Sequence, residues 1–156
     1  MLNTWGTLIA TLTGAAIALL GQHLNQRSAA HAKTAELLTN ACAEVSASSN
    51  DLLNRIWEEH ELQLTDRVTT WNLAGHRLAS ARVEILSQDA RLVSALHEVN
   101  DAGKALGAYW LRGNVDETEY ETRRRRYRTA VESFTTESGR AIRGRTTGAP
   151  PLTPGT

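Results

Sequence analysis

The sequence has few of the residues that disulfide frameworks, metal centres and sheets require. Its 156 residues include one cysteine, Cys42, which excludes an internal disulfide and a zinc site built from several thiolates. Aromatic residues make up 5% of the chain, and all three prolines follow residue 149. Alanine, leucine, arginine and glutamate dominate the middle instead. This composition favours helices over a sheet, so we predict an all-α fold.

Net charge and catalytic motifs are lacking as well. Lysine plus arginine (17) balances aspartate plus glutamate (17), so charge gives no reason to expect nucleic acid or an acidic substrate. His60-Glu61 and His97-Glu98 begin like the metalloprotease helix motif, but neither has a second histidine four residues later. His97 and Asp101 share a helical face without a visible third metal ligand. We therefore predict no enzyme, no cofactor, no metal, no nucleic-acid partner and no small-molecule substrate.

One uncharged stretch stands out, WGTLIATLTGAAIALLGQHL, from Trp5 to Leu24. At 1.5 Å per residue it is about long enough to cross a hydrocarbon core of roughly 30 Å. Trp5 lies at the edge of the stretch, where an indole prefers the membrane interface. The sequence therefore predicts a transmembrane helix over residues 5–24, preceded by a short tail, residues 1–4.

Two alternatives to a membrane span have weaker support. A cleaved signal peptide would carry a basic residue near its start and a small-x-small cleavage site, and neither is found around this stretch. A buried soluble helix would need a larger core than the rest of this polar chain supplies. The second alternative also includes a helix that lies at the membrane interface instead of crossing the membrane.

Small residues recur along one face of the predicted span. They lie at Gly6, Ala10, Gly14, Ala18 and Gly21. Four-residue spacing of small residues forms a shallow groove in which another helix packs closely. We expect a homo-oligomer or a complex with another membrane protein, although glycine and alanine are also common in unpaired membrane helices.

The charges after the span predict its orientation. Arg27 and Lys33 follow it, with His23 and His31 nearby, and the segment before it has no basic side chain. The positive-inside rule then places the body of the protein in the cytoplasm, as a single-pass protein of the cell membrane.

Residues 25–144 show helical apolar periodicity, which predicts an antiparallel, coiled-coil-like bundle of three or four helices. The first helix is expected to reach Leu64 unless Ser46–Asp51 interrupts it, with Cys42 buried on its apolar stripe. The later helices are expected from Asp66 to Leu86, from a Ser87 cap to Arg112, and from an Asp116 cap to Gly144. Residues 145–156, rich in threonine, proline and glycine, are expected to be disordered.

The strongest charge run lies in the last predicted helix. It comprises Arg123, Arg124, Arg125, Arg126 and Arg128. We expect a solvated face with ion pairs from Glu119 to Arg123 and from Glu121 to Arg125. The alternative is a contact with an acidic protein or a lipid surface. Glu58, Glu59 and Glu61 form an acidic group that is a possible intramolecular or intersubunit counterpart.

Several segments resemble a known group of proteins. Trp5–Ile9, WGTLI, opens a glycine- and alanine-rich span that is followed by the polar stretch Gln22–Arg27. This order resembles a widespread group of small single-span actinobacterial membrane proteins of unknown function. Ala81–Leu86, ARVEIL, resembles the end of their second helix, and Arg123–Gly144 resembles their last helix. The resemblance covers about residues 5–144; it implies an architecture and no functional residues.

These observations together favour one function. We expect a membrane-anchored helical interaction or scaffold protein that self-associates through the small-residue face of its span. The alternative is a phage-type lysis or envelope-stress membrane protein, because a single short span with a helical body also suits that class.

Overall fold

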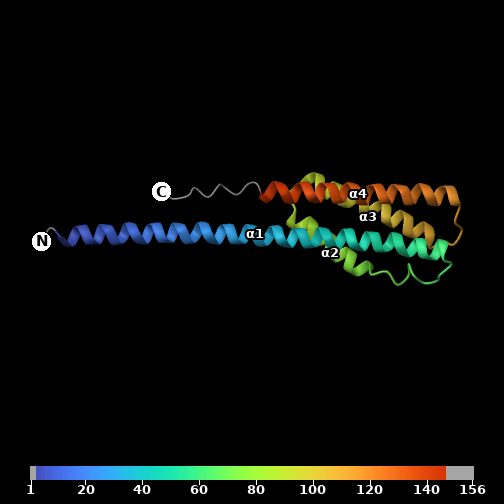
Figure 1. Ribbon diagram of the computed structural model, residues 1–156, viewed down its shortest axis with the longest axis horizontal. Coiled ribbons are helices and arrows are strands. Elements are labelled where there is room, and N and C mark those ends of the chain that lie inside the picture. Colours follow the sequence, from blue (N-terminus) through green and yellow to red (C-terminus); the bar gives the residue numbers. More distant parts are fainter. Residues whose placement is uncertain (1–2, 147–156) are drawn as a thin grey trace. The chain divides into compact units, whose positions relative to one another are not determined.

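The computed structural model describes the backbone of residues 3–146 and the side chains of residues 29–144. It contains four helices, α1 (Asn3–Glu61), α2 (Leu73–Leu86), α3 (Ala90–Trp110) and α4 (Glu117–Thr146), shown in Figure 1. The described residues contain no strand, which confirms the all-α prediction. The predicted disordered segment, residues 145–156, lies almost wholly outside the described residues.

The chain divides into two units, residues 1–36 and residues 37–156. The backbone of the predicted span, Trp5–Leu24, belongs to α1, in the first unit. Its side chains, including the small-residue face, lie outside the described residues. In the part of the chain whose side chains are described, no helix is both long and apolar enough to cross a membrane.

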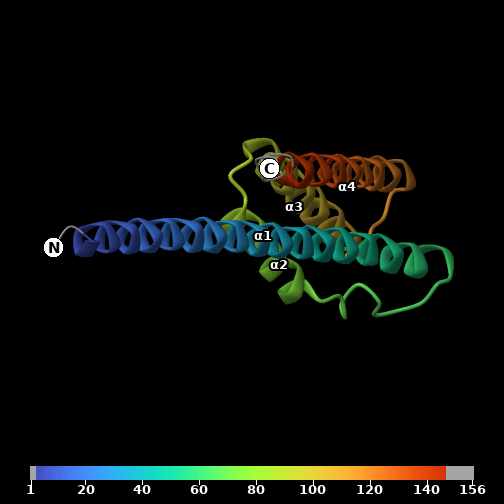
Figure 2. The same cartoon turned by 60° about the vertical axis from the view of Figure 1, so that its left-hand side comes forward.

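Neighbouring helices of the second unit run antiparallel, as Figures 1 and 2 show. Two contacts between α1 and α4 agree with the antiparallel direction. Ser46 of α1 contacts Thr135, late in α4, whereas His60, at the end of α1, contacts Glu117 at the start of α4. α3 packs along α4, but α2 has only a short contact with α3. The residues after Glu36 therefore form an all-helical bundle, with the end of α1 beside the start of α4.

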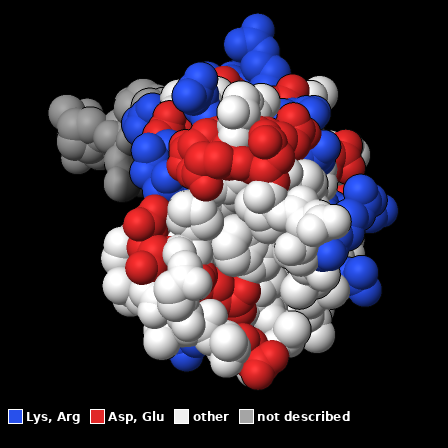
Figure 3. Space-filling model, turned by 90° about the vertical axis from the view of Figure 1, so that its right-hand side faces the viewer, with Lys and Arg blue, Asp and Glu red and all other residues white. Residues whose placement is uncertain are grey.

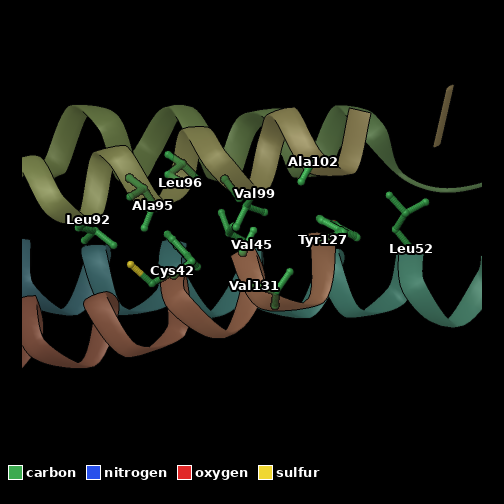
Figure 4. Packing of buried hydrophobic residues seen from close by; sticks show 14 of the residues in the cluster. Cys42, Val45, Leu52, Leu92, Ala95, Leu96, Val99, Ala102, Tyr127 and Val131 are labelled. Carbon is green, nitrogen blue, oxygen red and sulfur yellow. The ribbon is translucent and has the colours of Figure 1, made fainter. Parts of the chain in front are cut away.

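The core of the bundle lies between the apolar stripes of its helices. Tyr120, Tyr127 and Phe134 are its largest fully buried side chains. In Figure 4 side chains of α3 such as Val99 point toward Val45 of α1 and Tyr127 of α4. Burying each large aliphatic or aromatic side chain stabilises the fold by about 1.5–3 kcal/mol.

The predicted core positions are largely confirmed. Cys42 is 3% exposed, as expected for a small apolar residue. The other residues expected on the apolar stripes that are buried are Leu38, Ala41, Val45, Leu52, Ile56, Val68, Leu92, Leu96, Val99, Leu106, Tyr120, Tyr127, Ala130, Val131, Phe134 and Ala141. The apolar face expected for the second helix is wrong, because Leu78 and Ile85 are exposed and α2 buries Ala79 and Val83 instead.

α1 continues without interruption through Ser46–Asp51. Ser48 Oγ donates to the Val45 carbonyl at 3.1 Å, and Asn50 Nδ2 donates to the Ser46 carbonyl at 3.0 Å. Polar side chains that bond to the carbonyls of their own helix do not need to end it. α1 stops at Glu61, three residues before the predicted end, because the connection then enters the left-handed region at Gln63 (φ 54°).

The predicted start of the second helix at Asp66 is wrong. α2 begins at Leu73, where the side chain of Asn72 accepts a hydrogen bond from Gly75 N at 2.9 Å. The preceding connection is held by contacts with α1. Arg55 donates to the Arg67 carbonyl at 2.9 Å, and Trp71 Nε1 donates to the Ser48 carbonyl at 3.0 Å. These contacts between distant residues override the helical pattern of the segment.

The predicted cap of α3 is wrong, and the predicted cap of α4 is confirmed. Asp89, and not Ser87, caps α3, because its carboxylate accepts from Arg91 N and Leu92 N. Asp116 caps α4 as predicted, accepting from Glu119 N at 2.9 Å. α4 continues two residues beyond Gly144, since one glycine costs a helix only about 1 kcal/mol.

Two glycines of α3 have different surroundings. A Cβ added to Gly103 would lie 2.9 Å from Cε2 of the fully buried Tyr127, whereas one added to Gly107 would meet nothing within 4 Å. Gly103 therefore permits α3 and α4 to approach closely, and Gly107 has no such role.

We expect Gly103→Ala and Gly107→Ala to change stability in opposite directions. Overpacking against Tyr127 should destabilise the first variant by about 1–3 kcal/mol in spite of its better helix propensity. The second should gain up to about 1 kcal/mol from propensity alone. Thermal unfolding followed by circular dichroism measures both, and equal shifts would contradict the close approach of α3 and α4.

Candidate functional site

The arginine run lies around several sides of α4. We call its five residues together the basic face (Arg123, Arg124, Arg125, Arg126 and Arg128). Arg123 and Arg124 are half-buried, and the other three are exposed. Successive residues of a helix are rotated by about 100°, so four consecutive arginines cannot share one direction. The run therefore spreads around α4, with two arginines half-buried and three exposed.

The two half-buried arginines have partners within the bundle. Arg123 pairs with Glu119 at 2.6 Å, as predicted, and its guanidinium lies 4.9 Å from the centre of the Tyr109 ring. Glu121 pairs with Arg124 at 3.0 Å. Glu121 therefore pairs with Arg124, on the side of α4 that faces α1, and not with Arg125 as predicted.

The three exposed arginines have no ion-pair partner among the side chains that the structure describes. The predicted acidic counterpart does not supply one. Glu58 pairs with Arg67 at 2.6 Å, Glu59 accepts hydrogen bonds from Trp110 Nε1 and Val68 N, and Glu61 contacts His60. Intramolecular pairing between the acidic group and the basic face does not occur in the described residues.

Two grooves flank α4, and arginines of the basic face line both. The α1–α4 groove has a volume of about 350 Å³ and is lined by Asn50, Leu53, Asn54, Trp57, Arg124, Arg128, Val131 and Glu132. The α3–α4 groove has a volume of about 470 Å³ and is lined by Glu98, Ala102, Thr122, Arg125, Arg126, Thr129 and Ala130. Every unpaired arginine of the run therefore borders a concave surface.

Acidic side chains gather at the end of the bundle where α1 ends and α4 begins, with basic side chains around its sides (Figure 3). His60 lies there between two carboxylates, 3.0 Å from Glu61 and 3.0 Å from Glu117, and stacks on Tyr120 with 4.6 Å between ring centres. Desolvation opposes the charged ring, but the hydrogen bonds to Glu61 and Glu117 outweigh it and raise the pKa of His60. Protonated His60 links α1 to α4.

A second polar cluster, absent from the sequence-based predictions, joins α1, α2 and α3. His76 is 7% exposed; its Nδ1 lies 2.6 Å from Ser48 Oγ, and its Nε2 lies 2.9 Å from Asn100 Oδ1. Ser80 Oγ donates to the same Asn100 oxygen at 3.4 Å, and the Trp71 ring lies 5.2 Å from that of His76. Burial lowers the pKa of His76, partly offset by the bond to Asn100.

The Ser48–His76–Asn100 cluster has the residue types of a catalytic triad but not its surroundings. Neither groove includes any of the three residues. Ser48 lies in the middle of α1, where backbone N–H groups are engaged in the helix and do not form an oxyanion hole. The cluster therefore acts as a neutral hydrogen-bonded link that holds α2 to α1 and α3.

Among the side chains that the structure describes, no group of three or more histidine, cysteine or carboxylate residues is arranged to hold a metal ion. His97, considered with Asp101 as a possible metal pair, lies 3.1 Å from Glu84 of α2 instead. This contact links α2 to α3 at the surface.

No protein-family model, curated protein or solved structure matches this chain. The resemblance to small actinobacterial membrane proteins therefore stays a prediction.

We expect the His76 cluster to make the bundle less stable in mild acid. Because the folded state lowers the pKa of His76 below its ordinary value of 6.5, the unfolded chain binds a proton first as the pH falls. Wild-type protein should thus lose more thermal stability than His76→Gln between about pH 7.5 and about pH 5.5.

His60 has the opposite effect, because a raised pKa favours the folded state below 6.5, but it is present in both proteins and cancels in the comparison. Equal pH dependence of the two melting temperatures would contradict the role given to His76.

Proposed function

We propose that this chain is a membrane-anchored helical interaction protein whose bundle recruits an acidic protein partner through the basic face of α4. The observation that carries the proposal is the set of three exposed arginines, Arg125, Arg126 and Arg128, without ion pairs among the described side chains. Arginine binds carboxylates through two parallel hydrogen bonds, so such side chains favour an acidic partner.

The distribution of the arginines favours a protein over a lipid surface. Arg128 borders the α1–α4 groove, and Arg126 borders the α3–α4 groove. A flat bilayer surface touches one side of a helix, whereas side chains of a protein partner reach into concave grooves on both sides. Arginine is also enriched at the energetic centres of protein interfaces.

The proposed anchor is the uncharged stretch Trp5–Leu24, whose length suits a single membrane crossing. Its face of Gly6, Ala10, Gly14, Ala18 and Gly21 supports self-association, because small residues permit close helix packing in lipid. A dimer anchored in this way would present two copies of the basic face, and paired sites raise the effective affinity for a multivalent partner.

We expect Gly14→Leu to weaken self-association of the full chain in detergent at least about tenfold, because the larger side chain separates the paired helices. Analytical ultracentrifugation measures the change. Leu12→Ile is the matched control, since Leu12 lies on the opposite side of the predicted helix. A strictly monomeric wild-type protein, or extraction from membranes by carbonate, would argue against the anchored oligomer.

The positive-inside pattern predicts where the bundle lies. With Cys42 replaced by alanine and a new cysteine at Thr153, a membrane-impermeant thiol reagent should label lysed cells but not intact cells. Because Cys42 is replaced, the new cysteine is the single thiol of the variant, and labelling reports the position of the tail alone. Labelling of intact cells would place the bundle outside and reverse the predicted orientation.

A further inference from the structure

We propose that the α1–α4 groove is the docking site for an amphipathic helix of the acidic partner, anchored on Trp57 and oriented by Arg128. The inference rests on the proposed function and specifies which of the two grooves flanking α4 receives the partner and in what conformation. It is carried by the composition, the spacing and the charge of the groove.

The α1–α4 groove combines polar side chains with two aliphatic residues and an exposed aromatic side chain. Leu53 of α1 and Val131 of α4 line it, and the Trp57 side chain at its edge is 41% exposed. Tryptophan and arginine dominate the binding energy of many protein interfaces, especially beside apolar contacts that exclude water. The α3–α4 groove has the more apolar lining of the two, but its apolar residues are alanines and it contains no aromatic side chain.

The spacing of the lining residues matches a helical partner. On α1 the groove residues Asn50, Asn54 and Trp57 recur at steps of four and three. On α4 the residues Arg124, Arg128 and Val131 repeat the same steps. Side chains of a helix at i, i+4 and i+7 follow this repeat, so a third helix laid between α1 and α4 contacts both rows at once.

The charges give the partner a direction. Arg128 has no ion pair among the described side chains, and Arg124, paired with Glu121 at 3.0 Å, stands one turn before it. Glu132 lines the groove one turn after Arg128. A partner carboxylate is therefore attracted at Arg128 and repelled at Glu132, which favours one orientation of the partner and one register.

The test uses the full chain in phosphatidylcholine nanodiscs and a fluorescent synthetic helix with leucine along one face and glutamate beside it. A peptide with lysine in place of glutamate is the charge control. Fluorescence anisotropy should show binding of the glutamate peptide only, weakened by salt. Peptide that partitions into lipid contributes equally to every variant, so differences between variants report the groove.

Four variants separate the groove from general surface charge. Arg128→Glu and Trp57→Ala should each weaken binding at least about tenfold, and Glu132→Gln should strengthen it about threefold. Arg77→Glu is the matched control, because Arg77 is an exposed arginine on α2 away from the groove. It should leave binding unchanged. Circular dichroism confirms that each variant is folded.

Any of the following results would contradict the proposal. Equal binding of the lysine peptide, or equal losses in Arg128→Glu and Arg77→Glu, would show charge attraction without a site. Loss of binding in Arg126→Glu with retention in Arg128→Glu and Trp57→Ala would move the partner to the α3–α4 groove, which keeps the proposed function and overturns this inference. Displacement of the peptide by phosphatidylserine vesicles, dependent on Arg128, would replace the partner helix with a lipid surface.

Discussion

Tyr127 packs against Gly103 at the centre of the bundle, and the positions of α3 and α4 depend on this contact. The ring is fully buried, and its Cε2 atom lies 2.9 Å from the position that a Cβ atom at residue 103 would take. Burial raises the pKa of Tyr127 to about 12, so the phenol stays neutral inside the core. Any larger residue at position 103 must displace α4 or the ring, because packed cores have little free space.

The position of Tyr127 also determines what α4 presents to solvent. With Tyr120, Tyr127 and Phe134 directed into the core, the arginines between them must lie at the flanks and on the outer side of the helix. Arg124 and Arg128 then face the groove beside α1, and Arg126 faces the groove beside α3. The same periodicity that builds the core therefore places the proposed recognition residues around it.

Two histidines give the bundle opposite responses to pH. His60 favours the folded state when protonated, because it lies between Glu61 and Glu117. His76 favours it when neutral, because its buried ring bonds to Ser48 and Asn100 without a carboxylate partner. Acidification thus strengthens the link between α1 and α4 while weakening the attachment of α2, which has little other contact with α3.

The sequence by itself determined the helical class, most core positions, the stop near Gly113 and the Asp116 cap, because these depend on local periodicity and capping chemistry. Only the tertiary structure decided the start of α2, the pairing of Glu121 with Arg124, and the His76 cluster. Each of these depends on residues far apart in the chain or on competition between neighbouring partners. The two grooves belong to the same group, since a concave surface exists only when two helices meet, and no pattern within one helix specifies its neighbour.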